Sequence, residues 1–315
     1  MFFRSCILSL ALISNMFQTY SWGFFAHEKI NETAIFSLPA EMISFYKTYL
    51  PIIKARAINA DKRRYVIEGE APRHYIDMEH YAESVPCYWH TINTHHSQEK
   101  LTMHGILPWH IFKMMHRLTS AFKKQDVIQI LKLSADIGHY IADACVPLHT
   151  TKNYDGQYTN QKGIHAFWES RLPELFADQY DLCVGKAYYI DEPYTTIWDL
   201  VQSSYSLVEK VLAIEKKVNE RFSFYKQYCF EKRGTSIRKM YSREYAQAYH
   251  TALEGMVEER MRKSILMVAS AWYTCWVNAG QPNLTLLCSK KSVQEKLAKE
   301  KLPKKKLTNV RTCES

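Results

Sequence analysis

Hydrophobic residues recur every three or four positions along most of the chain, which is the spacing that lines one face of an α-helix. This pattern predicts helical segments over residues 22–38, 39–49, 108–124, 195–220 and 245–277. Another helix is predicted to begin after Asp126, a residue suited to an N-cap, and to end near Cys145 ahead of Pro147. No alternating run is long enough to predict a sheet. The pattern therefore predicts an all-α fold, organised as a single multi-helix domain.

Two stretches interrupt the helical pattern. Residues 61–81 contain Gly69 and Pro72, so we expect an irregular segment in which tertiary folding brings Asp61 and His74 together. Residues 87–107 are rich in Ser, Thr and Asn and are predicted to form a surface loop. Four histidines of this loop lack paired ligand spacing and are expected to be exposed, with no catalytic role: His90, His95, His96 and His104.

Composition agrees with a globular helical protein, because 47% of the 315 residues are hydrophobic and Gly and Pro number only ten each. The first twenty-one residues are typical of a signal peptide, with a basic start and an apolar core from Cys6 to Ser14. Cleavage before Trp22 would export the protein to the periplasm or the medium. An uncleaved membrane anchor is the alternative, although the apolar run is too short to span a bilayer.

Charge and cysteine content add little to this picture. The net charge is +9, but residues 289–315 hold nine Lys or Arg and three acids, so most of the basicity lies in this tail. We expect a solvated, disordered tail or one attracted to an anionic membrane or nucleic acid. The globular domain would then span residues 22–288. Seven cysteines follow the predicted signal peptide without a C-x-x-C pair, which disfavours a thiolate zinc site.

The candidate chemistry is concentrated in residues 138–169. His139 and Asp143 are four residues apart, as are His165 and Glu169, and on a helix this spacing places each pair on one face. His149 lies between the pairs, just after Pro147, which would turn the chain back toward the same place. A lone histidine is more often a hydrogen-bonded core residue, but five nitrogen and oxygen donors so close together predict a metal centre.

Further donors upstream enlarge the set beyond the needs of one tetrahedral zinc ion, which takes about four ligands. If Trp22 is the mature N-terminus, its free amino group is one of them. The complete candidate set is Trp22, His27, Asp61, His74, His139, Asp143, His149, His165 and Glu169. A cluster of several ions is therefore predicted.

In this order and spacing, the residues resemble a superfamily that joins the zinc-dependent phospholipases C of bacteria with the single-strand-specific nucleases of fungi and plants. The similarity covers about residues 22–169 and includes the run His139-x-x-x-Asp143-x-x-x-x-x-His149. It implies a trinuclear zinc cluster at the end of a helical core. The ligands of the first zinc would be Asp61, His74, His139 and Asp143. Those of the second would be the amine and carbonyl of Trp22, His27 and the bridging Asp143. Those of the third would be His149, His165 and Glu169.

Such a centre suits hydrolysis of phosphoric esters, because zinc makes hydroxide available near pH 7 and screens the charge of the phosphate. The bridged pair is expected to hold the attacking hydroxide, and the third zinc to steady the leaving group. Asp61 or Asp77 would orient or deprotonate the water, although Asp77 is equally well explained as a solvent-facing acid. Arg64 lies where the nucleases place a basic residue for phosphate, and a plain surface arginine is the alternative.

Two substrate classes remain open, with a slight preference for phospholipase C-type cleavage of a phosphodiester. His27 follows Trp22 by five positions, as in the nucleases, whereas Glu169 as last ligand is typical of the phospholipases. The D-x-G-G-N segment of the nucleases is reduced to Asp155-Gly156-Gln157. A single-strand nuclease or 3′-nucleotidase on the same centre is the second hypothesis. A third is a non-catalytic zinc-binding protein that contacts a membrane peripherally through its basic tail. No obligate protein partner is evident, and no G-x-S-x-G or H-E-x-x-H motif occurs.

Overall fold

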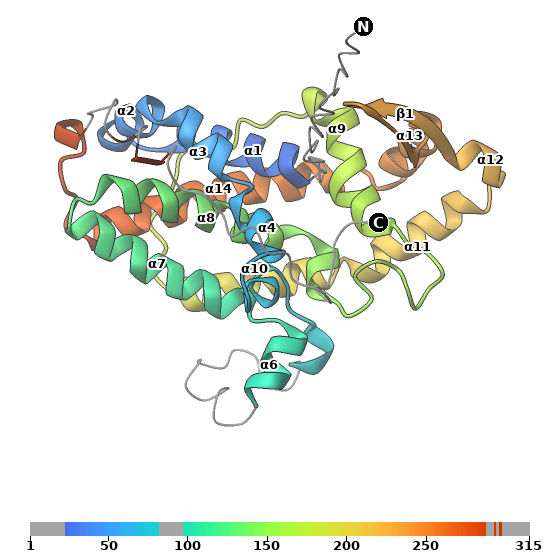
Figure 1. Ribbon diagram of the computed structural model, residues 1–315, viewed down its shortest axis with the longest axis horizontal. Helices are drawn as coiled ribbons and strands as arrows, with labels where there is room; N and C mark the ends of the chain where they lie inside the picture. Colours follow the sequence, from blue (N-terminus) through green and yellow to red (C-terminus); the bar gives the residue numbers. More distant parts are fainter. Residues whose placement is uncertain (1–22, 82–96, 288–292, 294–295, 298–315) are drawn as a thin grey trace, which may run out of the picture.

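The computed structural model describes residues 23–81, 97–287, 293 and 296–297. Several predictions fall outside these residues and concern the signal peptide (1–21), most of the basic tail (289–315), Trp22, His90, His95 and His96. Within the described part the fold is all-α apart from one two-stranded hairpin (Figure 1). The predicted fold class is therefore confirmed.

The described helices and strands follow one another along the chain, with longer irregular segments over residues 151–165 and 180–192. In order they are α1 (Gly23–Ala34), η1 (Ile35–Ser37), α2 (Ala40–Thr48), α3 (Leu50–Arg56), α4 (Asn59–Arg64), η2 (Ala71–His74), η3 (Met78–His80), α6 (Gln98–His104), α7 (Leu107–Lys123), α8 (Val127–Cys145), η4 (Pro147–Thr150), the π-helical turn η5 (Ala166–Arg171), α9 (Leu172–Phe176), η6 (Ala177–Gln179), α10 (Pro193–Tyr205), α11 (Val208–Asn219), α12 (Phe224–Gln227), β1 (Tyr228–Arg233), β2 (Ser236–Tyr241), α13 (Arg243–Ala252), α14 (Met256–Asn278) and η7 (Thr285–Leu287).

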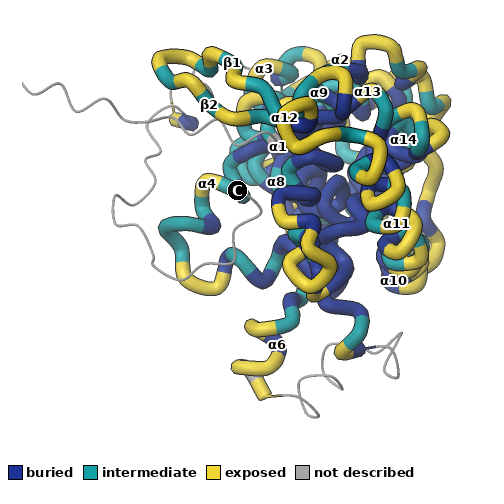
Figure 2. The backbone as a smooth tube through the Cα atoms, turned by 90° about the vertical axis from the view of Figure 1, so that its right-hand side faces the viewer, coloured by how far each residue is buried: buried dark blue, intermediate teal, exposed yellow. Residues whose placement is uncertain are grey.

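Helix α8 lies at the centre of the fold. From Leu133 to Cys145 every residue except Asp136 is buried, and α1, α7 and α14 pack around it (Figures 1 and 2). The helix begins where expected, because the Asp126 side chain accepts a hydrogen bond of 3.1 Å from the Gln129 amide. A second, smaller apolar cluster forms around Phe167, beyond the C-terminal end of α8. The predicted metal ligands on α8, His139 and Asp143, are both buried in the C-terminal half of this central helix.

Helices α1 and α8 approach closely at Gly138, next to the predicted ligand His139. A Cβ atom at Gly138 would lie 1.8 Å from Oδ1 of Asn31, whose Nδ2 donates a hydrogen bond of 3.1 Å to the Ala135 carbonyl. Gly138→Ala should therefore push the two helices apart and lower the free energy of unfolding by about 1–3 kcal/mol. Denaturant titration checks this, with Gln129→Ala on the same helix as control. Equal midpoints for the two variants would contradict the close approach.

Two segments that were each predicted to be one long helix are divided into two helices in the structure. The segment predicted over 195–220 is divided into α10 and α11, and the segment predicted over 245–277 is divided into α13 and α14. The second break falls at Glu254 and Gly255, which both have positive φ angles, 53° and 80°. Gly255 adopts this left-handed conformation without a steric cost. The first break contains neither Gly nor Pro, so the hydrophobic pattern runs through it unchanged.

One short hairpin was not predicted, because no alternating run in the sequence indicated a sheet. Strands β1 and β2 pair antiparallel, with Tyr228 opposite Tyr241 and Arg233 opposite Ser236. Each strand is only six residues long and carries lysine or arginine beside aromatic residues, so it lacks the alternation of apolar and polar residues that marks a half-buried strand. Residues 98–104 likewise form α6 where a surface loop was expected.

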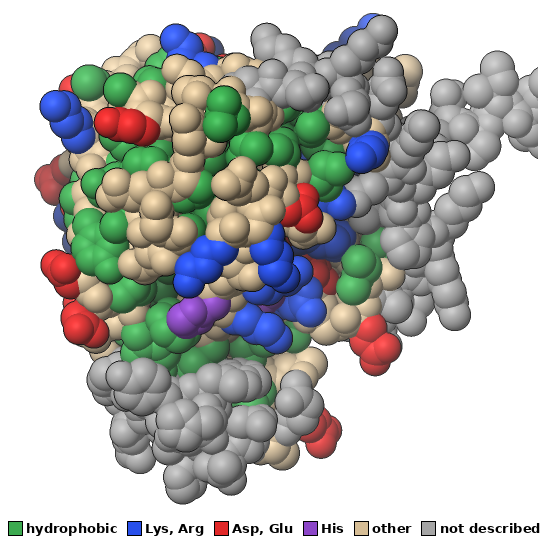
Figure 3. Space-filling model, turned by 90° about the vertical axis from the view of Figure 1, so that its left-hand side faces the viewer, with side chains coloured by type: hydrophobic (Ala, Val, Ile, Leu, Met, Phe, Trp, Pro, Cys, Tyr) green, Lys and Arg blue, Asp and Glu red, His purple; other side chains and the backbone are tan. Residues whose placement is uncertain are grey.

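The surface of the described part is unevenly charged. Lys and Arg side chains gather near the middle of one end of the molecule (Figure 3). No described helix is both long and apolar enough to cross a membrane.

Candidate metal centre

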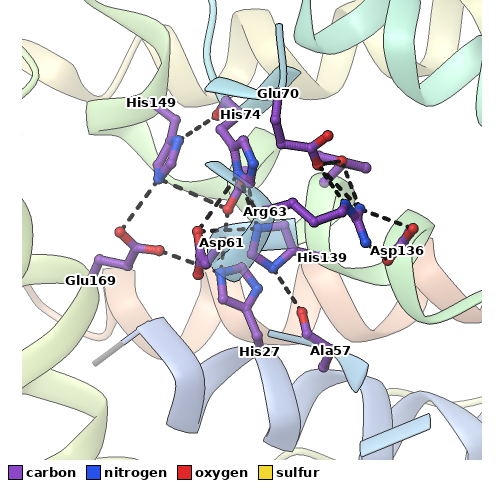
Figure 4. Close-up of polar contacts among 12 residues, drawn as sticks. His27, Ala57, Asp61, Arg63, Glu70, His74, Asp136, His139, His149 and Glu169 are labelled. Carbon is purple, nitrogen blue, oxygen red and sulfur yellow. Dashed lines mark hydrogen bonds and ion pairs between the residues drawn. The ribbon is translucent and has the colours of Figure 1, made fainter. Parts of the chain in front are cut away.

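Eight of the nine predicted ligands lie in the described part of the chain, and all eight side chains converge at one place, most of which Figure 4 shows. Trp22, the ninth, lies outside it. The eight come from six separate segments: His27 from α1, Asp61 from α4, His74 from η2, His139 and Asp143 from α8, His149 from η4, and His165 and Glu169 from η5 and its N-cap. His27, Asp61 and His74 lie 65 or more positions before His139, so the tertiary fold is needed to bring them to the donors of residues 139–169.

Asp143 occupies the middle of this cluster and is 1% exposed. Its Oδ2 atom lies 3.0 Å from Nδ1 of His74 and 3.4 Å from Nε2 of His139. Its Oδ1 atom lies 3.3 Å from Nε2 of His27 and 3.9 Å from Nε2 of His149. The two oxygens therefore face different histidines, which is the arrangement that a bridging carboxylate requires.

Asp61 completes a group on the Oδ2 side of Asp143. Its Oδ1 atom lies 3.5 Å from Nε2 of His139 and 3.7 Å from Nδ1 of His74. Two ligand atoms that share a tetrahedral zinc ion are about 3.3 Å apart, given bonds of about 2.0 Å. Separations of this size fit donors that surround one ion.

A second group forms between the loop after α8 and the π-helical turn η5. Oε2 of Glu169 lies 2.8 Å from Nε2 of His165 and 3.4 Å from Nε2 of His149. The other carboxylate oxygen of Glu169 lies 3.7 Å from Nε2 of His27, so this group adjoins the one around Asp143. The predicted pairing of His165 with Glu169 is thus present, on a π-helical turn, a local irregularity that often marks functional sites.

Backbone carbonyls fix the orientation of three of the histidines. Nδ1 of His139 lies 2.8 Å from the Ala57 carbonyl, that of His149 lies 2.5 Å from the His74 carbonyl, and that of His165 lies 3.1 Å from the Tyr154 carbonyl. A neutral imidazole that donates through Nδ1 carries its lone pair on Nε2. All three Nε2 atoms face carboxylate oxygens. The lone pair of each Nε2 atom would therefore repel those of the carboxylate unless a metal cation or a proton lies between them.

The carboxylates of the cluster are held in their ionised form. Burial alone would raise the pKa of Asp143 and of Glu169, but neighbouring imidazoles hold both pKa values well below the usual range. Burial opposes ionisation of Asp61 too, yet His139 and Arg64 lower its pKa strongly. Three ionised carboxylates in a buried space call for compensating positive charge.

The histidines respond to the same environment in opposite ways. Burial, with a further contribution from the charge of Arg64, lowers the pKa of His74 to about 4. Burial acts in the same direction on His139, but Asp143 and Asp61 outweigh it and raise the pKa of His139 to about 9. Without a metal ion, the proton on His139 therefore supplies part of the compensating charge, and a metal ion would have to displace it.

The donor set fits zinc. It consists of imidazole nitrogens and carboxylate oxygens, which zinc accepts, and it contains no thiolate. The eight residues could hold metal ions, as the sequence predicted.

A buried ionic network beside the cluster was not predicted. The Arg63 guanidinium donates to Asp136 at 3.0 and 3.2 Å and to Glu70 at 3.1 Å, and the Tyr140 hydroxyl donates to the same Glu70 carboxylate. Glu70 is fully buried, and the network joins α4, which carries Asp61, to α8. Asp136 and Tyr140 are four residues apart on the helix of His139, a spacing that could have indicated a second polar face.

Arg64 is buried, with 3% exposure, so the alternative of a plain surface arginine is wrong. Its charge lowers the pKa values of both Asp61 and His74, which places it beside the cluster.

Asp77 lies in a different group from the eight converging ligands. It is 4% exposed, so a solvent-facing acid is wrong, and its carboxylate lies 3.3 Å from Nδ1 of His104. The His104 ring stacks on His80 at 3.5 Å between centroids, and its side chain is only 14% exposed, which corrects the expectation of an exposed loop residue. Because these two rings are nearly parallel, at 20°, their in-plane lone pairs do not point at one common ion.

Comparison with known proteins adds one finding. No family model matches the chain, and no curated protein does. Among solved structures, the chain is similar to the alpha-toxin of Clostridium perfringens isolated from avian strain SWCP, with 12% sequence identity and a TM-score of 0.48. The similarity covers 83% of this chain and 65% of the toxin chain. At this level the likeness says nothing by itself about what the protein does.

Proposed function

We propose that this protein is an exported, zinc-dependent hydrolase of phosphoric esters, and that it cleaves a phosphodiester as phospholipases C do. One observation carries the proposal. Eight donors from six segments converge with ligand-like separations around Asp143, and three of the histidines are fixed with Nε2 turned inward. A purely structural cluster would have no need of three ionised carboxylates facing those nitrogens.

The proposed ligand groups follow the two oxygens of Asp143. Asp61, His74 and His139 would hold one zinc with Oδ2, and His27 would hold a second with Oδ1 and the amino terminus of Trp22. His149, His165 and Glu169 would hold a third. The His27 and His139 rings stack 3.9 Å apart at 28°, so their in-plane lone pairs are poorly placed to meet at one ion. This stacking supports separate ions on the two sides of Asp143.

When bound, zinc supplies a readily ionised water and neutralises charge on the phosphate. The protein's own groups would orient the reactants. Asp61 is the most exposed of the cluster side chains, at 15%, and its low pKa keeps it ionised, so it can accept a hydrogen bond from the attacking water. Arg64 beside it can donate to a phosphate oxygen. Asp77, paired with His104, is a weaker candidate for the role at the water.

A single-strand nuclease is the second candidate, and the short spacing between Trp22 and His27 favours it. The deciding experiment assays purified mature protein on phosphatidylcholine micelles, single-stranded DNA and a 3′-nucleotide, each with and without chelator. We expect chelator-sensitive release of phosphocholine. Chelator-sensitive turnover of the nucleic-acid substrates alone would favour the nuclease. Absence of turnover on all three would contradict the proposal.

Arg64→Ala is expected to lower kcat/KM by about 10²- to 10³-fold on the preferred substrate, because one donor to the developing phosphate charge is lost. Zinc content should stay unchanged, since Arg64 is not a ligand. Lys62→Ala is the matched control, because Lys62 is an exposed cation on the same helix. Steady-state kinetics with metal analysis checks both variants. Equal kcat/KM for Arg64→Ala and the control would contradict this role.

A further inference from the structure

The hairpin β1–β2 and the short helix before it expose an unusual number of large apolar side chains. Phe230 and Ile237 on the hairpin are 77% and 74% exposed, and Phe224 and Tyr225 on α12 are 63% and 90% exposed. Figure 2 shows the hairpin at the edge of the molecule, with exposed segments along it. Exposed apolar side chains scattered singly are normal, but a contiguous group indicates an interaction surface.

The same segment of the chain is strongly basic. Residues 221–241 contain six Lys or Arg and one acid. The pairing register places Phe230 opposite Lys239 and Ile237 opposite Lys232, so lysines alternate with apolar side chains on one face. The Lys239 amine also lies 3.6 Å from the centre of the Tyr228 ring. The face therefore combines aromatic and aliphatic side chains with lysines.

The one acid of this segment, Glu231, belongs to the opposite face, where it links the hairpin to η5. Glu231 accepts a hydrogen bond of 2.9 Å from Arg171, which also donates to the Tyr241 carbonyl at 3.0 Å. Arg171 follows Glu169 by two residues on η5. The Tyr241 ring stacks on Phe167 of the same turn, 3.9 Å between centroids. The hairpin is thus attached to the segment that carries a predicted zinc ligand.

We propose that this face, formed by Phe224, Tyr225, Phe230, Lys232, Ile237 and Lys239, docks the protein on the surface of a phospholipid membrane that contains anionic lipids. Aromatic side chains favour the boundary between headgroups and acyl chains, and lysines are attracted by an anionic surface. The proposal rests on the proposed function, because an enzyme that cleaves phospholipids has to meet them at a membrane. It differs from contact through the basic tail, because it uses residues joined to the metal centre.

The test measures co-sedimentation of the zinc-loaded mature protein with vesicles of phosphatidylcholine, with and without phosphatidylglycerol. We expect binding that increases with phosphatidylglycerol and weakens with salt. Phe230→Ser with Ile237→Ser should weaken it by about tenfold or more, because two apolar side chains no longer enter the interface. Lys232→Gln and Lys239→Gln should each weaken binding to the anionic vesicles on the order of fivefold.

Phe36→Ser is the matched control, because Phe36 is 56% exposed and has Lys47 over its ring, but lies on η1 near α2, at the other end of the molecule in Figure 1. All variants should hydrolyse monomeric short-chain phosphatidylcholine as the parent does, which shows that the centre is intact. Two results would overturn the docking site. The hairpin variants could bind vesicles as strongly as the parent protein, or they could lose binding to single-stranded DNA while keeping their binding to vesicles. Binding to vesicles is measured by co-sedimentation alone, independently of whether the protein hydrolyses the phospholipid. Hairpin-dependent binding by a protein that cleaves no phospholipid would uphold the docking site and refute only the phospholipase.

Discussion

Replacing Asp143 with asparagine is expected to reduce hydrolysis by about 10³-fold or more and to remove zinc from the protein, the largest effect of any single substitution. Each carboxylate oxygen faces a different set of histidines, His74 and His139 on one side and His27 on the other. Asparagine keeps the size of the side chain but loses the charge and one of the two anionic oxygens, so it cannot serve two cations.

Metal analysis and kinetics of Asp143→Asn test this expectation. Asp126→Asn is the control on the same helix, because asparagine is also a good N-cap and Asp126 is exposed. Circular dichroism verifies that both variants retain their helices. Full zinc content in Asp143→Asn would contradict the role of Asp143 as a ligand shared by two zinc ions.

Removal of zinc is expected to reverse the pH dependence of stability between pH 6.5 and 9. In the metal-free protein, Asp143 and Asp61 outweigh the effect of burial and raise the pKa of His139 to about 9, compared with about 6.5 in an unfolded chain. A raised pKa contributes stability that is complete below pH 6.5 and is lost as pH rises through 9. The loss corresponds to about 3 kcal/mol for a shift of this size.

With zinc bound the slope has the opposite sign, because metal ions compete with protons for the imidazoles and bind more tightly as pH rises. Melting temperatures of the chelated and zinc-loaded protein, measured in parallel from pH 6.5 to 9, test this prediction. We expect the melting temperature of the chelated protein to fall over this range and that of the zinc-loaded protein to rise. His139→Gln should remove the decline in the chelated protein. Parallel curves for the two forms would contradict the prediction.

The parts of the site that the sequence predicted are those in which the donors follow local spacing. His139 and Asp143 share a face of α8 because they are one helical turn apart, and His165 and Glu169 meet in the same way. The Asp126 cap and the end of α8 near Cys145 were predicted for the same reason, since capping and proline act over a few residues. Asp61 and His74 were expected to be brought together by tertiary folding, and the fold places their Oδ1 and Nδ1 atoms 3.7 Å apart.

Features that depend on distant residues were not predicted. Arg63 bonds to Asp136 across 73 positions, so no spacing in the sequence indicates the pair. The hairpin carries lysines beside aromatic residues on an exposed face, and therefore lacks the buried side that gives a strand its apolar alternation. Arg64 and Asp77 were weighed as surface residues because a charged side chain alone does not show whether other segments cover it.

The count of zinc ions in the purified mature protein tests the central claim most directly. Elemental analysis of protein purified without chelator, combined with sequencing of its N-terminus, should find about three zinc ions per chain and a first residue of Trp22, since nine donors exceed the needs of one or two tetrahedral ions. Fewer than two zinc ions per correctly processed chain would contradict the existence of a zinc cluster around Asp143.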